Sequence, residues 1–287
     1  MKLQVHHRTH YAYGTPVRDS FNEARLQPTT ADGQVCHSFV LKVLPPTRLT
    51  HYLDFQFNYV HLFDLTEPHA ALTVDATSIV STASRALPAG QATLPLAEME
   101  RACGHLERCH DFLQPSRFAD PSPEARALGE AAAAGRSDAW AVAQAVMAQV
   151  HREFAYMPAA THVHTHMRDV LRLRRGVCQD FAHVMIGACR ALRIPCRYAS
   201  GYLYNGPADQ LRGAQASHAW VEVYLPELGW RGLDPTNNSQ PDERYVKVAV
   251  GRDYGDVPPI KGTYRGTGEH KMTVEVLVTA LDPVPVA

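Results

Sequence analysis

The sequence lacks the features that direct a protein to nucleic acid, membranes or phosphate ligands. Lysine and arginine number 28 against 29 aspartate and glutamate, so no global field draws the chain to nucleic acid or to an anionic membrane. No apolar run is long enough to cross a bilayer, and no glycine-rich phosphate loop of the Walker or dinucleotide type occurs. The first residues alternate like a strand without an apolar signal-peptide core, which predicts a cytoplasmic protein.

Cysteine is also sparse, with six residues in a chain of 287. In a reducing cytosol scattered cysteines are expected to be free thiols, and most buried ones are simply small apolar residues. The question is therefore which of the six reacts. They are Cys36, Cys103, Cys109, Cys178, Cys189 and Cys196.

The hydrophobic periodicity changes near residue 85. Residues 1–85 hold several short extended runs separated by turn residues, which predicts an N-terminal all-β domain of the sandwich or open-barrel type. The first run, Leu3–Tyr13, is expected to end at Gly14-Thr15-Pro16. Small residues, proline and glycine predict a linker over 86–98. From 99 to 287 helical segments precede extended ones, so we expect an α+β core with helices packed on an antiparallel sheet and C-terminal strands.

Three helices are expected in the first half of that core. Ser122 and Pro123 open the first, because serine is a good N-cap and proline suits the first turn. Ser137 is expected to cap the second, in which apolar residues recur at helical spacing from Trp140 to Phe154. A third helix is expected within 168–195, and it stops at Pro195.

One cysteine lies at the start of a predicted helix. From Cys178 onward apolar residues fall on one helical face, and Gly176 permits a tight turn just before it. The free N–H groups and the positive dipole end of a first turn favour an anion, and the thiolate is the nucleophilic form of cysteine. Cys178 is therefore a candidate nucleophile. The alternative is an inert cysteine at the start of a core helix.

A predicted β-hairpin supplies a histidine and a carboxylate. Ser217–Leu225 alternates, with His218 and Trp220 on one face, and the chain returns after a turn as far as Asp234. A hairpin centred on Pro226 puts His218 directly opposite Asp234, and one centred on Glu227 makes them diagonal neighbours on the same face. A hairpin centred half a residue away would place His218 and Asp234 on opposite faces of the sheet. The two side chains can therefore meet only if the loop contains an odd number of residues.

Cysteine, histidine and aspartate together form a nucleophile, base and orienting carboxylate. Each member also has an ordinary structural interpretation. His218 could be a half-buried strand histidine, and Asp234 could cap the turn at Pro235-Thr236.

Four segments resemble the bacterial transglutaminase-like proteins, which are papain-like cysteine enzymes with a transglutaminase core. The N-terminal strands and the segment from Gly251 to Pro259 resemble a bacterial subgroup in which a β domain precedes that core. The resemblance implies that Cys178 is the nucleophile, His218 the base and Asp234 the orienting carboxylate. The four segments are Arg175–His183, Tyr198–Tyr202, His218–Val223 and Gly229–Thr236.

The family chemistry is attack on an amide carbonyl, which forms an acyl-thioester that is released to water or to an amine. We expect hydrolysis of a peptide or amide bond, with transfer of a protein glutamine to an amine as the alternative. A catalytically silent binding module is an alternative of another class. The expected partner is a peptide or protein amide substrate, without nucleic acid, membrane, metal or organic cofactor.

The thioester route also needs an oxyanion hole. We expect it to combine the backbone N–H of Cys178 with a side-chain donor, for which Tyr156 is the candidate. The animal enzymes use an upstream tryptophan there, and none occurs between Trp140 and Trp220. The other interpretation of Tyr156 is a core aromatic residue at a helix end.

Arginines and histidines gather beside the candidate nucleophile. The arginines belong either to a solvated helix face or to a basic rim that favours acidic peptides, with Arg174 and Arg175 as the substrate-binding candidates. They are Arg168, Arg172, Arg174, Arg175, Arg190, Arg193 and Arg197. Trp220 is a further substrate-binding candidate. His162, His164 and His166 would line one face of a strand, where surface histidines are the ordinary interpretation and a metal site is the alternative.

Overall fold

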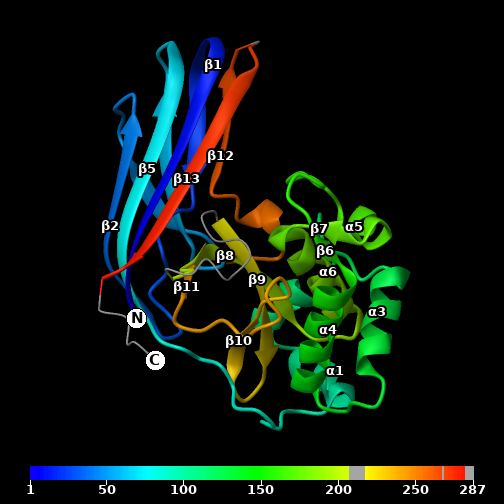
Figure 1. The fold of residues 1–287 in the computed structure, drawn as a ribbon. Coiled ribbons are helices and arrows are strands. Elements are labelled where there is room, and N and C mark those ends of the chain that lie inside the picture. The colour runs from blue at the N-terminus through cyan, green and yellow to red at the C-terminus, as the bar shows by residue number, and fades with distance from the viewer. Residues whose placement is uncertain (207–216, 267, 282–287) are drawn as a thin grey trace.

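A curved antiparallel sheet forms one half of the molecule (Figure 1). The computed structural model describes residues 1–206, 217–266 and 268–281. In these ranges the sheet has the strand order β2-β5-β1-β4-β3, and β12 and β13 also pair with β1. Its strands are β1 (Lys2–Ala24), β2 (Gln34–Leu44), β3 (Thr50–Leu53), β4 (Tyr59–Leu65), β5 (His69–Thr82), β12 (Ile260–Arg265) and β13 (His270–Ala280).

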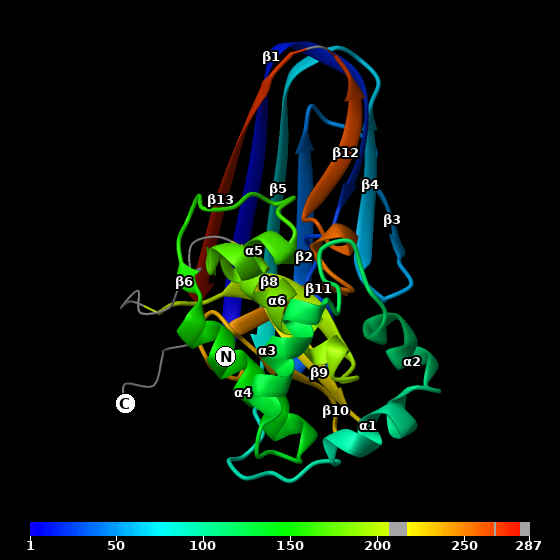
Figure 2. The same ribbon diagram turned by 90° about the vertical axis from the view of Figure 1, so that its right-hand side faces the viewer.

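The strand β1 runs through the point where the sequence predicted a turn. The expectation that it ends at Gly14-Thr15-Pro16 is wrong, because the strand continues to Ala24. Its first part pairs with β5 and β13, and its second part pairs with β4 and β12. The register with β5 shifts between Ala12 and Val17. Such irregularities bend strands, and here the sheet curves over into a half-open barrel (Figure 2).

The other half of the molecule packs helices against a second antiparallel sheet, with the strand order β10-β9-β8-β11. The predicted α+β class is confirmed. The sheet consists of β8 (Cys196–Leu203), β9 (Ser217–Leu225), β10 (Gly229–Leu233) and β11 (Tyr245–Gly251). The α-helices are α1 (Leu96–Cys103), α2 (Glu107–His110), α3 (Pro123–Ala133), α4 (Ala139–Glu153), α5 (Met167–Leu173) and α6 (Cys178–Ala191). Short elements are η1 (Asp111–Leu113), η2 (Tyr254–Asp256) and the parallel pair β6 (Ala155–Tyr156) and β7 (Arg175–Gly176).

Two helix starts test the capping rules. Ser122 caps α3 by accepting a hydrogen bond from the Ala125 N–H, with proline at the first position, as predicted. The cap of α4 is Asp138 and not Ser137, because the Asp138 carboxylate accepts from the Ala141 N–H at 2.8 Å.

The predicted helix within 168–195 is two helices. Arg174 ends α5 in the left-handed conformation, with φ of 51°, and the short strand β7 follows before α6 begins. The helix α6 is buried along almost its whole length and packs against α3, α4 and β9. The break between α5 and α6 therefore leaves Cys178 at a helix start.

Side chains from the curved sheet bind the edge of the second sheet. The Gln34 side chain donates to the Lys247 carbonyl at 2.7 Å and accepts from its N–H at 2.8 Å. Asn58 makes the same pair of bonds to Val250, both at 2.8 Å. Because these amides occupy the free edge of β11, the two sheets are held in a fixed relation.

No helix in the described parts of the chain combines the length and the apolar character needed to cross a membrane.

Candidate active site

Cys178 is the first residue of α6 and is half-buried. The turn before it is fixed by Asp180, whose Oδ2 atom accepts from the Val177 N–H at 2.8 Å and from the Thr161 hydroxyl at 2.5 Å. Gly176 is required here, because a Cβ atom at this position would lie 2.5 Å from the same oxygen. The sulfur is thus presented by a tightly held turn at the positive end of a helix.

His218 and Asp234 lie in the hairpin of β9 and β10. Gly229 pairs with Leu225 and Leu233 pairs with Val221, so the hairpin is centred on Glu227 with a three-residue loop. The predicted odd-length loop is confirmed, and His218 and Asp234 are diagonal neighbours on one face. His218 Nε2 lies 2.8 Å from Asp234 Oδ2, and both side chains are fully buried.

Asp234 is held by groups that the sequence analysis did not identify. Its Oδ2 atom accepts from the Tyr245 hydroxyl and from Asn237 Nδ2, both at 2.8 Å. Its Oδ1 atom accepts from the Thr236 N–H at 2.8 Å, so Asp234 also caps the turn at Pro235-Thr236. This is the structural role that the sequence analysis gave as the alternative. Burial alone would raise the pKa of Asp234. The His218 charge and the hydrogen bonds outweigh burial and hold this pKa below its usual value.

The second ring nitrogen of His218, Nδ1, relates the His218–Asp234 pair to Cys178. Nδ1 is buried and makes no well-aligned hydrogen bond to any residue that the structure describes. Since Nε2 is taken by Asp234, the interaction of the ring with Cys178 falls to Nδ1. Burial lowers the pKa of His218, but the Asp234 carboxylate and the adjoining Cys178 raise it to about 10. The structure therefore brings Cys178, His218 and Asp234 together from α6, β9 and the end of β10.

The Asp234→Asn variant should show that the His218–Asp234 pair stabilises the fold in a pH-dependent way. The folded-state pKa of His218 lies above its ordinary 6.5, so the stabilisation is complete below pH 6.5 and is lost as the pH rises through about 10. We expect the wild type to exceed the variant by a few kcal/mol in unfolding free energy at pH 6, and by much less at pH 10. Urea unfolding at both pH values measures this. A pH-independent difference would contradict it, and Asp169→Asn at the surface is the control.

The weaker site candidates lie around this group. Tyr156 is half-buried in β6, directly beside Gly176 of β7, and its ring meets that of Phe181 edge-on at 6.3 Å. Trp220 is only 2% exposed and lies behind the imidazole, with 6.3 Å between the ring centroids of Trp220 and His218. In the folded protein the Trp220 ring lies against the rings of His218 and Tyr245. Its role towards a substrate stays a prediction, as does that of Tyr156.

The arginines do not form one continuous face. Both Arg174 and Arg175 are exposed, but Arg174 pairs with Glu153 at 2.9 Å and stacks over the Phe154 ring. The expectation that Arg190 belongs to a solvated face or rim is wrong. It is buried and donates to backbone carbonyls, including that of Arg252 at 2.7 Å. The guanidinium thereby ties α6 to surrounding loops.

The histidine run is not in a strand. His162, His164 and His166 lie in the loop between β6 and α5, so the strand prediction is wrong. His166 caps α5, since its Nδ1 accepts from the Arg168 N–H at 3.2 Å. No group of three or more potential metal ligands occurs within the ranges that the structure covers.

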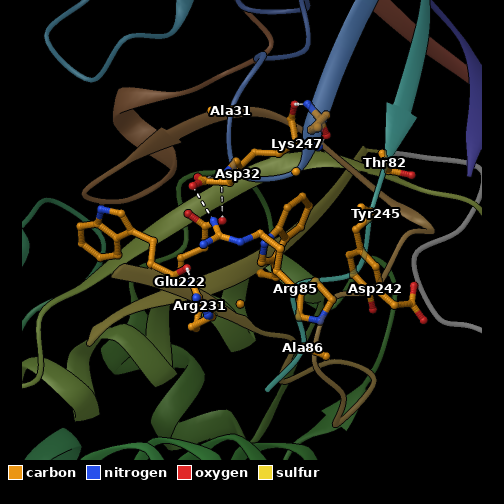
Figure 3. A pocket seen from close by; sticks show the side chains of 17 residues that line it. Ala31, Asp32, Thr82, Arg85, Ala86, Glu222, Arg231, Asp242, Tyr245 and Lys247 are labelled. Atoms are coloured by element: carbon orange, nitrogen blue, oxygen red, sulfur yellow. Dashed lines mark hydrogen bonds and ion pairs between the residues drawn. The ribbon is translucent and has the colours of Figure 1, made fainter. Parts of the chain in front are cut away.

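A small cavity of about 70 Å³ lies behind Trp220 and Tyr245 and is lined by charged side chains (Figure 3). At its wall Lys247 lies between Glu222 Oε1 at 2.9 Å and Asp32 Oδ2 at 2.8 Å. Arg197 reaches the other side of the Glu222 carboxylate at 2.6 Å. These ion pairs connect the loop before β2 to the strand that carries His218.

Lys247→Met should destabilise the protein because it removes one of the two largely buried cations that pair with Glu222. Removing one partner of a buried pair costs about 3–5 kcal/mol, and the lower end applies because Glu222 keeps Arg197. Chemical denaturation measures the change. The same substitution at exposed Lys42, in β2, is the control and should change stability by less than about 0.5 kcal/mol. Equal effects at the two positions would refute this role of Lys247.

Comparison with known proteins identifies the family. Residues 126–235 match the Transglutaminase-like superfamily, and residues 3–81 match the Bacterial transglutaminase-like N-terminal region. The uncharacterized protein ML0607 of Mycobacterium leprae is 36% identical over 283 residues, which cover 98% of this chain and 99% of that protein. This chain belongs to the transglutaminase-like superfamily.

Two further proteins match different shares of this transglutaminase-like chain. A Protein-glutamine gamma-glutamyltransferase of Pseudomonas aeruginosa is 32% identical over 157 residues, which cover 50% of this chain and 24% of that enzyme. The crystal structure of a cysteine-protease candidate from Cytophaga hutchinsonii superposes with a TM-score of 0.75 at 24% identity, covering 99% of this chain and 93% of the other. The second comparison shows that the whole fold is shared, including the curved sheet.

Proposed function

We propose that this transglutaminase-like chain is a cysteine-dependent acyl-transfer enzyme that hydrolyses a peptide or amide bond. The observation that carries the proposal is the buried His218–Asp234 pair at 2.8 Å, with the free side of the imidazole towards half-buried Cys178. A nucleophile, a base and an orienting carboxylate in this order are the arrangement that activates a thiol.

The reaction would proceed in two steps. His218 Nδ1 takes the proton of Cys178, and the thiolate attacks the amide carbon to form a tetrahedral oxyanion. The imidazolium returns the proton to the leaving amine, which leaves an acyl-thioester on Cys178. Water, deprotonated by His218, then releases the acid and the free thiol. Asp234 keeps the ring oriented and stabilises its positive charge throughout.

The oxyanion would be bound at the start of α6. The first N–H groups of a helix have no partner within the helix, so the Cys178 N–H is available to the developing charge. The Tyr156 hydroxyl is our candidate for the second donor, because β6 runs beside the turn that leads to Cys178.

Protein-glutamine transamidation is the second candidate, and the 32% identity to the Pseudomonas enzyme favours it. In that reaction a lysine amine replaces water in the second step. A reducing compartment such as the cytosol suits either reaction, because all six cysteines are thiols in the structure.

Brief treatment with iodoacetamide near neutral pH, followed by intact-mass analysis, tests the proposal. We expect fast single-site alkylation at Cys178 that slows strongly in His218→Ala. Indifferent labelling of the accessible thiols in both proteins would instead indicate a catalytically silent binding module. Adding a labelled primary amine together with a glutamine-containing protein then separates transfer from hydrolysis.

A further inference from the structure

A larger pocket, of about 460 Å³, lies between the curved sheet and the core. The curved sheet contributes Tyr11 and Tyr13 from β1 and Tyr264 from β12. The core contributes Tyr254 of η2 and Val163 of the loop between β6 and α5. Figure 2 shows this loop on the side of the core that faces the sheet. The pocket therefore exists only because the two halves of the molecule are held together.

The core wall of this pocket adjoins the candidate nucleophile. The Val163 carbonyl accepts a hydrogen bond from Gln179 Nε2 at 3.1 Å, and Gln179 is the residue after Cys178. On the other side the Tyr254 ring meets Tyr198 edge-on at 6.4 Å. Tyr198 is within electrostatic reach of Cys178, because burial first and then the Cys178 charge raise the pKa of Tyr198. The core wall of the pocket is thus connected to the segment that carries Cys178 through Val163 and through Tyr254.

The charge on the pocket wall has one sign. Arg117 and Lys261 are exposed side chains that line it, and the described lining residues include no aspartate or glutamate. Neither cation has an ion pair with a carboxylate in the described part of the chain, although Arg117 stacks over the Phe118 ring at 5.0 Å. Arg174, by contrast, is already paired with Glu153. Arg175 is also exposed and without an ion pair in the described residues, but it does not line the pocket. Arg117 and Lys261 are therefore the free positive charges of the pocket wall.

Apart from Asn22, His164 and His270, the remaining lining is aromatic or apolar. Tyrosine rings offer flat apolar faces with a hydroxyl at the edge, and burial raises the pKa of Tyr11 to about 12, so its hydroxyl stays a donor. Such a wall suits a planar or apolar side chain, and the two unpaired cations suit a carboxylate beside it.

We propose that this pocket binds an acidic peptide segment next to the scissile amide, with an aromatic side chain between the tyrosines and a carboxylate against Arg117 and Lys261. The inference rests on the proposed function and specifies its substrate class. It also assigns the preference for acidic peptides to Arg117 and Lys261 and not to Arg174.

Affinity labelling tests the pocket separately from the chemistry. The probes are three N-acetyl peptide chloromethyl ketones, with the sequences Phe-Glu-Ala, Phe-Lys-Ala and Ala-Glu-Ala, and iodoacetamide as a small neutral reagent. We expect Phe-Glu-Ala to alkylate Cys178 at least about tenfold faster than either other peptide, because it alone offers both an aromatic ring and a carboxylate. In the double variant Arg117→Gln/Lys261→Gln its advantage over Phe-Lys-Ala should fall about tenfold.

Two controls make the outcome decisive. Lys42→Gln removes the same charge from an exposed position in β2 and should leave every rate unchanged. Tyr264→Ala should reduce the advantage of Phe-Glu-Ala over Ala-Glu-Ala, while the iodoacetamide rate stays constant in all pocket variants. Equal rates for the three peptides, or equal effects of Lys42→Gln and the double variant, would refute the proposal that this pocket binds an acidic peptide. Failure of iodoacetamide to select Cys178 in the wild type would overturn the proposed function instead.

Discussion

Cys178→Ser should lower the acyl-transfer rate by at least about 10³-fold while leaving the fold intact. A serine hydroxyl is a far weaker nucleophile than a thiolate, and removing one member of such a group removes most of its catalytic effect. Stability should change little, because the side chain is half-buried and oxygen replaces sulfur with almost the same volume. The measurements are the initial rate on an amide substrate and the melting temperature.

Cys36→Ser is the matched control for this loss. Cys36 is also a half-buried thiol, but it lies in β2 of the curved sheet, and its sulfur donates only to the Ser38 carbonyl. The control should keep full activity and lose only one titratable thiol. A Cys178→Ser protein that retained a tenth of the wild-type rate would mean that another residue carries the chemistry.

His218→Ala should lower the rate of Cys178 alkylation and of substrate turnover by about 10²–10⁴-fold. The variant removes the base that adjoins Cys178, and in the described structure His218 Nδ1 has no competing hydrogen bond. Asp234→Asn should cost less, since the base remains and the Tyr245 hydroxyl and Asn237 can still bind the replaced group. The loss of rate is expected to be larger in His218→Ala because this variant removes the base, whereas Asp234→Asn disturbs only the orientation of the base.

His37→Ala provides the control for the histidine substitution. His37 is exposed in β2, and its side chain bonds to the Ser81 hydroxyl at 2.7 Å, so its loss should not change either rate. If Asp234→Asn proved more damaging than His218→Ala, the carboxylate would have to act on the substrate directly. The assigned division of roles between the two residues would then be wrong.

The site is more predictable from the sequence than the sheet that surrounds it. Alternation in Ser217–Leu225 and a short turn define the face and the register of the hairpin, which places His218 beside Asp234. The cysteine at a helix start follows from local rules in the same way. Tyr245 was not predictable, because its contact with Asp234 arises from a strand at the far edge of the second sheet and from no local pattern.

Errors in the sequence analysis occur where distant partners decide the structure. Gly14-Thr15-Pro16 has the composition of a turn, but pairing with β4, β5, β12 and β13 carries β1 through it. Arg190 has the sequence context of a surface residue, and its burial is explained by carbonyls from distant segments, among them those of Phe112 and Arg252. The pocket between the two halves is likewise invisible in the sequence, since its walls come from both ends of the chain and from its middle.

The pairing of β1 with β13 has a consequence for biosynthesis. Val5 lies opposite Val278, so β1 is synthesised long before the strand that covers this flank. Until β13 has been made, one flank of β1 is an open template for foreign strands, and chaperones would have to protect it. Deleting β13 would therefore leave this flank of β1 permanently uncovered.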